Sequence, residues 1–232
     1  MIGSIINIYI PSCVSLFRLT STMNFYLPLL DDWSILAAMT ETTRDKLIAI
    51  SIQTMAIKGF NNTGIAEILA VANVPKGSFY HYFKSKDDLG FAIIEQYGQQ
   101  LRTEFEKHLD AAEGTALVRL QSYFNMILGY FEGDFGLCNC LLGNLGQELS
   151  MQNPAMRKAI FAHYRVVENL IAGCLREAKA EGELSSDADE QMLAKMFFAS
   201  WEGCLVRAKL EQSAQPLRDL MHLYFSLVFK AK

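Results

Sequence analysis

The stretch "GFNNTGIAEILAVANVPKGSFYHYFKSKDDL", residues 59–89, contains two short helical patterns joined by a tight turn. Thr63 is placed to cap the first helix, whose apolar side chains are spaced to face inward. Asn73 is the expected turn residue, because asparagine tolerates a positive φ at modest cost. We expect the second helix to begin at Pro75 or Lys76, since proline suits the start of a helix.

A longer helix is predicted immediately before this pair. Thr42 and Thr43 can cap "RDKLIAISIQTMAIKGF", and Gly59 suits the left-handed position after its last turn. Spacings of four and three form a stripe that would be buried, consisting of Ile48, Ile52 and Met55. A supporting helix followed by two short helices across a tight turn is the helix-turn-helix arrangement.

The second helix of the pair is predicted to have two different faces. Phe79 and Phe83, four residues apart, would pack inward against the other two helices. The outward set is mostly polar and consists of Lys76, Gly77, Ser78, Tyr80 and His81. Such a set suits the major groove of DNA, and Lys84 and Lys86 would neutralise flanking phosphates. The alternative is an aromatic core helix with a solvated lysine tail.

Charge is distributed unevenly along the chain. The 232 residues include 21 basic and 25 acidic side chains, a net charge of −4. Residues 40–90 carry a net +1, whereas residues 1–39 carry −1 and residues 91–232 carry −4. A module of +1 is weakly charged for binding DNA as one copy, so we expect two copies to act together on half-sites about 34–36 Å apart.

Residues 59–89 resemble the DNA-binding head of the tetracycline-repressor (TetR) family of one-component bacterial regulators. The positions that match the family pattern are Gly59, Phe60, Thr63, Ile68, Val74, Gly77, Ser78, Tyr80, Tyr82, Phe83, Ser85 and Lys86. The chain departs from that pattern at Gly64, Leu69, Asn73 and Pro75.

The resemblance implies roles for individual residues of the head. Lys76, Gly77 and Ser78 would approach bases, and Tyr80 would approach a base or a phosphate. The full set of implied DNA-contacting residues is Thr43, Thr63, Lys76, Gly77, Ser78, Tyr80, His81, Tyr82 and Lys86. The resemblance also implies a homodimer, a palindromic operator in double-stranded DNA, and release when a small-molecule effector binds the C-terminal domain.

The chain as a whole predicts an all-α protein with two working parts. Residues 40–86 form the expected helix-turn-helix DNA-binding domain, and residues 87–232 form a helical ligand-binding and dimerisation domain. Helical patterns in the second part cover residues 87–112, 115–133, 137–150, 154–182, 187–212 and 216–230.

The pattern over residues 187–212 is apolar around much of its circumference, so this helix must be covered on two sides. Together with the last helix it suits an interface that closes by two-fold symmetry. The candidate interface residues are Phe198, Trp201, Leu205, Leu220 and Tyr224. The alternative is an ordinary internal helix.

Aromatic side chains in the middle of the body are candidates for lining an effector pocket. They include Tyr97, Phe124, Tyr130 and Phe131. Pockets of this kind are mainly apolar with few polar groups, which favours a largely uncharged ligand. The alternative is ordinary core packing.

The segment "GLCNCLLGNLGQELS", residues 136–150, places Cys138 and Cys140 at the N-terminal end of a predicted helix, where the helix dipole favours a thiolate. It resembles the equivalent region of a TetR subgroup that includes the electrophile-responsive N-ethylmaleimide reductase repressor, with Cys140 at the matching position. That resemblance implies that Cys140 senses reactive electrophiles or oxidants. The alternative is a buried cysteine that acts as a small hydrophobe.

Residues 1–39 differ in composition from the rest of the chain, with only Arg18, Asp31 and Asp32 charged. Their apolar start fits neither a signal peptide nor a membrane helix. We expect a non-native or flexible extension with Met39 as the natural start, and the alternative is a hydrophobic arm that packs on the body or touches a membrane. Five cysteines, an odd number, argue for reduced thiols in a cytoplasm.

The predicted function is a ligand-responsive transcriptional repressor that needs no cofactor and no metal. The sequence contains no Ser/His/Asp set, no HExxH motif, no phosphate loop and no paired carboxylates near a histidine. An all-α enzyme is therefore the weaker alternative, and an activator of the same fold is the closer one. The expected partners are DNA, an effector and a second copy of the chain, with no membrane involved.

Overall fold

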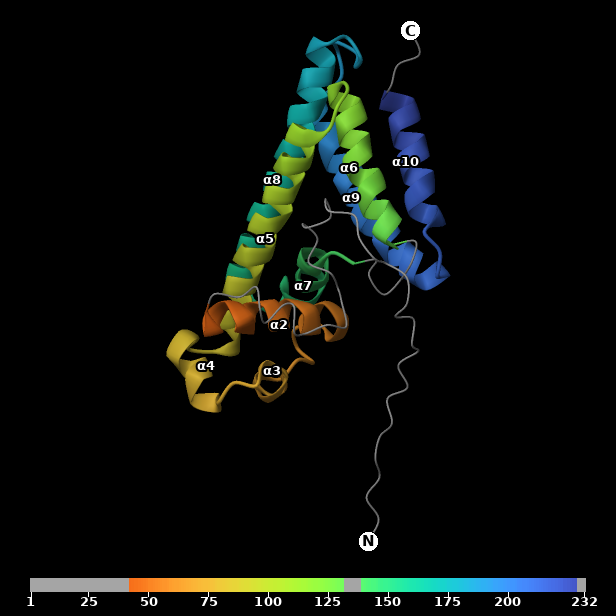
Figure 1. The fold of residues 1–232 in the computed structure, drawn as a ribbon. Helices are drawn as coiled ribbons and strands as arrows, with labels where there is room; N and C mark the ends of the chain where they lie inside the picture. Colours follow the sequence, from red (N-terminus) through yellow and green to blue (C-terminus); the bar gives the residue numbers. More distant parts are fainter. Residues whose placement is uncertain (1–41, 132–138, 229–232) are drawn as a thin grey trace, which may run out of the picture.

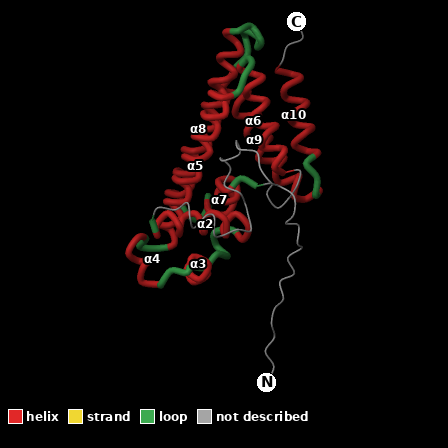
Figure 2. Tube along the Cα trace, in the orientation of Figure 1, coloured by secondary structure: helices red, strands yellow, loops and turns green. Residues whose placement is uncertain are grey.

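The computed structural model describes residues 42–131 and 139–228. Within these two ranges the chain forms nine α-helices and no strand (Figures 1 and 2), which confirms the predicted all-α class. The helices are α2 (Thr43–Lys58), α3 (Ile65–Ala72), α4 (Lys76–Tyr82), α5 (Lys86–Ala111), α6 (Ala116–Phe131), α7 (Leu141–Leu149), α8 (Pro154–Ala180), α9 (Glu190–Glu211) and α10 (Gln215–Val228). The predictions for residues 1–39 and for Cys138 fall outside the described residues.

The head consists of α2, α3 and α4, which lie together at one end of the molecule (Figure 1). Thr42 caps α2 as predicted, because its hydroxyl accepts a hydrogen bond from the backbone N–H of Asp45 at 3.2 Å. Asn73 ends α3 in the left-handed conformation, with φ at 51°, which also agrees with the sequence pattern. This turn releases the chain to begin α4 after Pro75.

The predicted cap of α3 by Thr63 is wrong. The helix begins at Ile65 with Gly64 as its N-cap, and no side chain caps it. The Thr63 hydroxyl instead donates a hydrogen bond to the carbonyl oxygen of Gly59 at 2.7 Å, and the residue is fully buried. Thr63 therefore closes the turn between α2 and α3.

The body has the outline of two legs that meet at the end far from the head (Figure 1). Helices α5 and α8 lie side by side along one leg, and α6, α9 and α10 form the other. Because α5 begins beside the head and ends at the far end, it joins the two parts. The short helix α7 lies against α2, between the head and the body.

Buried apolar side chains form two clusters that meet in the body. The first joins the head to the start of α5, to α7 and to the start of α8, and includes Phe79, Ile93 and Leu145. The second joins α6, α9 and α10 to the rest of α8 and to Phe105 of α5. Cys140 and Tyr164 pack against both clusters, so the junction between head and body cores passes through these two residues.

The observed helices agree with the predicted ones apart from their ends. Helix α9 begins at Glu190 because the Asp189 side chain caps it, accepting a hydrogen bond from the N–H of Met192 at 3.0 Å. Helix α7 begins at Leu141, so Cys140 is its N-cap and not part of its first turn. Among the helices of the described residues, none has the length and apolar character needed to cross a membrane.

Candidate nucleic-acid interface and buried polar site

Helix α4 has the two-faced structure that the sequence predicts. Phe79 is fully buried and Phe83, directly after the helix, is 2 % exposed, and their rings lie 5.5 Å apart. On the opposite side, Lys76, Gly77 and Tyr80 are exposed, as is His81, while Ser78 is half-buried. The aromatic anchors therefore hold the helix from behind and leave a polar face directed outward.

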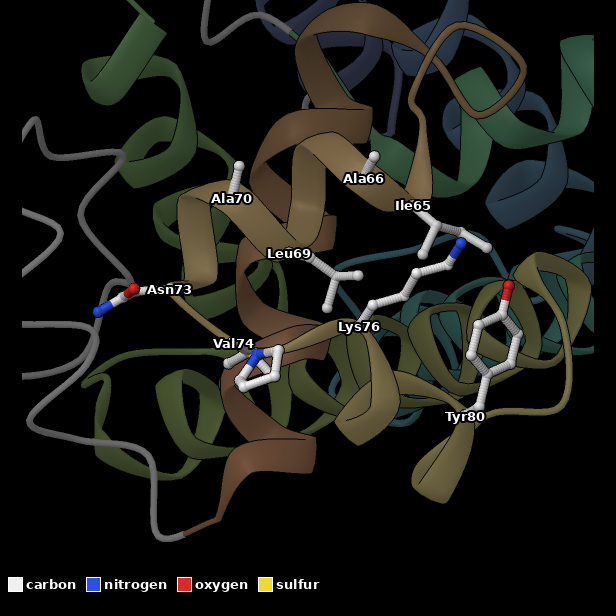
Figure 3. Close-up of a pocket in the computed structure, with 9 residues that line it drawn as sticks. Ile65, Ala66, Leu69, Ala70, Asn73, Val74, Lys76 and Tyr80 are labelled. Atoms are coloured by element: carbon white, nitrogen blue, oxygen red, sulfur yellow. The ribbon is translucent and has the colours of Figure 1, made fainter.

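A shallow groove runs between this face and α3 (Figure 3). It is lined by Ile65, Ala66, Leu69, Ala70, Asn73, Val74, Pro75, Lys76 and Tyr80. Figure 3 shows the Lys76 and Tyr80 side chains on the same side of α4, both reaching toward the Ile65 end of α3. A methyl group built on Gly77 would have no atom within 4 Å, so the backbone is open to a partner at this position. Hydroxyl and ammonium donors beside an open backbone are the groups that contact bases and phosphates.

The flanking candidates are less available than the sequence suggests. Thr43 and Tyr82 are half-buried, and the buried Thr63 side chain cannot reach DNA. The Lys86 ammonium lies 4.6 Å from the centre of the Phe60 ring and donates to the carbonyl oxygen of Asn61 at 3.3 Å. Burial lowers the pKa of Lys86. We conclude that Thr63 is no longer a candidate for contacting DNA. Lys86 also stabilises the turn between α2 and α3 of the head.

One carboxylate of the body holds the head directly. Glu148, near the end of α7, accepts hydrogen bonds from the backbone N–H groups of Phe60 and Asn61, each at 2.7 Å. These two donors follow Gly59, which has a φ of 80° and whose missing side chain leaves room for the carboxylate. The Glu148 contact thus fixes the turn between α2 and α3 to the body.

The other end of α7 lies in a cluster of half-buried polar side chains. Tyr97 of α5, Cys140 before α7, Tyr164 of α8 and Glu202 of α9 meet at the junction of the two apolar clusters. The Tyr164 hydroxyl donates to Oε2 of Glu202 at 3.2 Å, and the Cys140 thiol donates to the same carboxylate. The second oxygen, Oε1, is buried and has no hydrogen-bond partner among the described residues.

Burial controls the acid–base properties of this cluster. Desolvation raises the pKa of Glu202 to about 7, even though its hydrogen bonds with Cys140 and Tyr164 oppose the shift. Desolvation and the Glu202 charge raise the pKa of Cys140 well above its usual value. The expected effect of the helix N-terminus is present, because the backbone N–H groups of Leu142 and Gly143 lower the Cys140 pKa, but it is the weaker one. At Cys140, burial and the Glu202 charge therefore outweigh the helix N-terminus that the sequence indicated.

The Glu202 side chain reaches α7 at a glycine. A methyl group built on Gly143 would overlap Oε2 of Glu202 and would lie 3.2 Å from the Tyr164 hydroxyl oxygen. Any side chain at this position would displace the carboxylate from its two donors.

The remaining pocket candidates divide into two groups. Tyr97 lies beside Cys140 and its hydroxyl interacts with the backbone of Leu141. Phe124 is buried in an aromatic cluster, with its ring centre 4.6 Å from that of Phe197 and 4.8 Å from that of Trp201. Phe131 is also buried, whereas Tyr130 is exposed and lies near Glu104. The structure thus brings Tyr97 to Cys140 and places Phe124 in the ordinary core.

The predicted dimer residues are mostly core residues of a single chain. Phe198, Trp201, Leu205 and Tyr224 are each at most 9 % exposed, and Leu220 is half-buried. The four buried residues face the body's own apolar cluster, so their assignment to a contact between chains is wrong, whereas the partly buried Leu220 stays a candidate. An exposed stripe runs along the other side of α9 at spacings of four and three, consisting of Met192, Met196, Ala199, Gly203, Val206 and Leu210. On α10, Leu223 and Leu227 are also exposed.

Sequence reasoning did not single out Glu148 or Glu202. Nothing in its own helix distinguishes either glutamate, because its hydrogen-bond partners lie far away in the chain. The glycines of residues 136–150 were the available signal, because Gly143 is where the Glu202 carboxylate approaches α7.

Comparison with known proteins identifies both parts of the chain. Residues 47–93 match the family model "Bacterial regulatory proteins, tetR family", and residues 116–224 match "Tetracyclin repressor-like, C-terminal domain". The chain is 38 % identical to the transcriptional regulator AcuR of Cereibacter sphaeroides over 182 residues, which are 77 % of this chain and 81 % of that protein. It is 30 % identical to the transcriptional repressor NemR of Escherichia coli K12 over 179 residues, 77 % of this chain and 90 % of NemR.

A solved structure, the reduced form of E. coli NemR, is similar with a TM-score of 0.76 and 29 % identity, covering 82 % of this chain and 99 % of that one. Both named relatives regulate transcription, which points to a regulator and not to an enzyme. The polar face of α4, its buried aromatic anchors and these matches lead to one conclusion. The chain belongs to the TetR family of DNA-binding transcription regulators.

Proposed function

We propose that this regulator is a repressor that binds a palindromic operator as a homodimer and is released by a small molecule or reactive electrophile that reaches Cys140. The observation that carries the DNA-binding part is the exposed polar face of α4 with Phe79 and Phe83 buried behind it. Repression is favoured over activation because NemR is named a repressor. Transcription reconstituted from the regulator's own promoter separates the two, since a repressor lowers the transcript level and an activator raises it.

The exposed stripe of α9 supports a homodimer. Apolar residues at spacings of four and three form a continuous seam on one side of a helix. Met192, Met196 and Leu210 are each more than half exposed in the single chain, and Leu227 of α10 is 72 % exposed. A second copy placed across these two helices would remove this surface from water and form a two-fold interface.

The half-buried polar cluster supports an effector site in the body. Cys140 combines a nucleophilic atom with the hydroxyl of Tyr164 and the carboxylate of Glu202, in otherwise apolar surroundings. Binding sites for small molecules have this composition, mainly apolar with a few polar groups. Electrophiles that add to thiols are the effector class that this set favours.

Helix α7 supports a route from the effector site to the head. Its N-cap is Cys140, and Glu148 near its other end holds the turn of residues 59–63. Helix α5 adds a second connection, since it begins directly after the head. An effector needs a coupling of only about 1–3 kcal/mol to change operator affinity 5–150-fold.

The proposal is tested with the purified full chain and DNA selected by that chain from a random duplex pool. We expect the selected duplexes to contain two inverted half-sites, and N-ethylmaleimide to weaken binding by the wild type. Cys140→Ser should keep its DNA affinity after the same treatment, whereas Cys204→Ser, which removes a half-buried cysteine of α9, should respond like the wild type. Failure to enrich any sequence would contradict DNA recognition, and equal release of Cys140→Ser would contradict the effector site.

A further inference from the structure

We propose that Glu202 accepts the proton of Cys140 when that thiol adds to an electrophile, and that Tyr164 positions the carboxylate for this transfer. The inference rests on the proposed function, because it takes Cys140 as the residue that reacts. Beyond the proposed function, the inference names the group that accepts the proton of the Cys140 thiol.

The geometry brings three elements together at one point. Cys140 stands at the N-terminus of α7, Tyr164 lies on α8 and Glu202 lies on α9. Two donors, the Tyr164 hydroxyl and the Cys140 thiol, point at the Glu202 carboxylate. Oε1 remains without a donor among the described residues, so the carboxylate has capacity for one more proton or hydrogen bond.

The site needs a proton acceptor because the thiol is not ionised at rest. Burial raises the pKa of Cys140, and the nearby Glu202 charge raises it further. A thiol is a weak nucleophile until it loses its proton, so reaction in this environment requires a base within reach. A carboxylate whose pKa is about 7 is suited to this role near neutral pH, where a substantial fraction is ionised.

The groups around Glu202 do not compete for this role. Tyr97 and Tyr164 have pKa values raised well above neutral, so both remain protonated. Lys209 is the cation that acts on Glu202, and it lies seven residues further along α9, about 10 Å along the helix axis. Negative charge that develops on sulfur is stabilised by the backbone N–H groups of Leu142 and Gly143.

The step is a simple addition with no oxidant. With N-ethylmaleimide as the electrophile, the Cys140 sulfur forms a bond to one alkene carbon and the carbon–carbon π bond breaks. The electron pair of that π bond moves to the second alkene carbon and its adjoining carbonyl, while the thiol proton moves to Glu202. The protonated Glu202 then returns a proton to the second carbon, so the carboxylate is regenerated and the product is a thioether.

The addition also changes the carboxylate's surroundings. A thioether sulfur has no proton to donate, so Glu202 loses one of its two donors. A buried carboxylate with fewer donors is destabilised. This destabilisation acts at the N-terminus of α7, and Glu148 of the same helix holds the head.

The test measures the rate of N-ethylmaleimide addition at Cys140 by peptide mass spectrometry from pH 6 to pH 9. In the wild type the rate should rise with a midpoint near pH 7, the pKa of Glu202. Glu202→Gln keeps the shape of the side chain but cannot accept the proton, so we expect a rate at least about 100-fold lower at pH 7.5 and no midpoint near 7. Glu113→Gln, a change at an exposed glutamate after α5, is the matched control, and the rate at Cys204 in each sample serves as an internal standard.

A second variant separates positioning from folding. Tyr164→Phe removes a donor that lowers the pKa of Glu202, so the midpoint of the rate profile should move to higher pH. Equal rates and equal pH profiles in the wild type, Glu202→Gln and Tyr164→Phe would overturn the inference and leave the sensing role of Cys140 intact. A wild-type Cys140 that stays unmodified while Cys204 reacts would overturn the sensing role and this inference together.

Discussion

The head and the body expose their functional groups in opposite ways. The head gathers Lys76, Gly77 and Tyr80 within one helical turn and directs them outward. The body partly buries its polar groups and takes them from four helical regions separated by up to about a hundred residues. The polar face of α4 is built from neighbouring residues, whereas the polar cluster of the body is assembled from distant ones. The arrangement of the head can be predicted from the sequence, whereas that of the body is seen only in the folded structure.

Helix α7 connects these two arrangements. Its N-terminus belongs to the half-buried polar cluster, and Glu148 near its C-terminus holds the turn between α2 and α3 of the head. Nine residues of helix span about 13 Å, so the two sites are separated by a single rigid element. Each prediction below tests one part of this contrast.

The largest expected effect concerns the exposed stripe of α9, which is the proposed dimer surface. Glutamates in place of Met196 and Val206 would put four charges into the proposed two-fold seam of α9. The double variant should be monomeric, and its affinity for a palindromic duplex should fall about 10²–10⁴-fold because the second half-site contact is lost. Light scattering and fluorescence anisotropy measure the two quantities, with Val118→Glu, a change at an exposed valine of α6, as control. A dimeric double variant with wild-type affinity would place the interface elsewhere.

The next effect concerns the buried carboxyl groups of the body. Burial raises the pKa of Glu202 to about 7, above the ordinary value of 4.5, so the folded state holds the proton more tightly than the unfolded chain does. The stabilisation is complete below about pH 4.5 and is lost as the pH rises through about 7. Between about pH 4.5 and 7, the wild type should therefore lose about 2–3 kcal/mol more unfolding free energy than Glu202→Gln does. Urea unfolding at one fixed protein concentration measures this difference.

Glu104 provides an internal comparison for that measurement. Its pKa is also raised to about 7 by burial, but the side chain is less enclosed. Glu104→Gln should therefore change the pH dependence of the unfolding free energy in the same direction and by a smaller amount. An unchanged pH dependence in Glu202→Gln would show that this carboxyl group titrates normally in the folded protein.

A glycine tests how tightly the body's site is packed. Gly143→Ala would place a methyl group against Oε2 of Glu202, and we expect a loss of about 1–3 kcal/mol in unfolding free energy. Gly129→Ala on α6 is the matched control, because no atom lies within 4 Å of the added methyl group and alanine favours helix. That control should raise stability slightly. Equal stability of the two variants would mean that the Glu202 side chain moves away from α7 at little cost in free energy.

The smallest effect concerns the contact between body and head. Glu148→Ala leaves the N–H groups of Phe60 and Asn61 without their acceptor, which should lower the cost of opening this turn by about 1–2 kcal/mol. Hydrogen exchange at these two amides should then be about 5–30 times faster. Gln147→Ala, on the same helix and exposed, should leave their exchange unchanged.

Much of the head could be predicted from the sequence because its contacts are local. The spacing of Phe79 and Phe83, the Thr42 cap and the left-handed Asn73 each depend on a few neighbouring residues, and all three are present in the structure. Thr63 is the exception. Its hydroxyl has a choice between the N–H groups of α3 and the carbonyl oxygen of Gly59, and the folded turn brings the second within reach.

The body could be predicted only at the level of helices. Helix α9 is apolar on several sides, so its pattern could not show that Phe198 and Trp201 face the core while Met192 and Met196 face outward. The position of Cys140 at a helix N-terminus suggested a thiolate, but burial and Glu202 outweigh the helix dipole. Both outcomes depend on neighbours that the fold supplies.

The most direct test of the central claim, that the outward face of α4 binds DNA, compares two exposed aromatic residues. Tyr80 of α4 is 53 % exposed and Phe161 of α8 is 59 % exposed, so replacing either with alanine should leave thermal unfolding unchanged. Tyr80→Ala should weaken binding to the selected duplex by about 30-fold or more, because the residue acts once in each half-site, and Phe161→Ala should bind like the wild type. A Tyr80→Ala protein that binds the duplex as tightly as the wild type would contradict the claim.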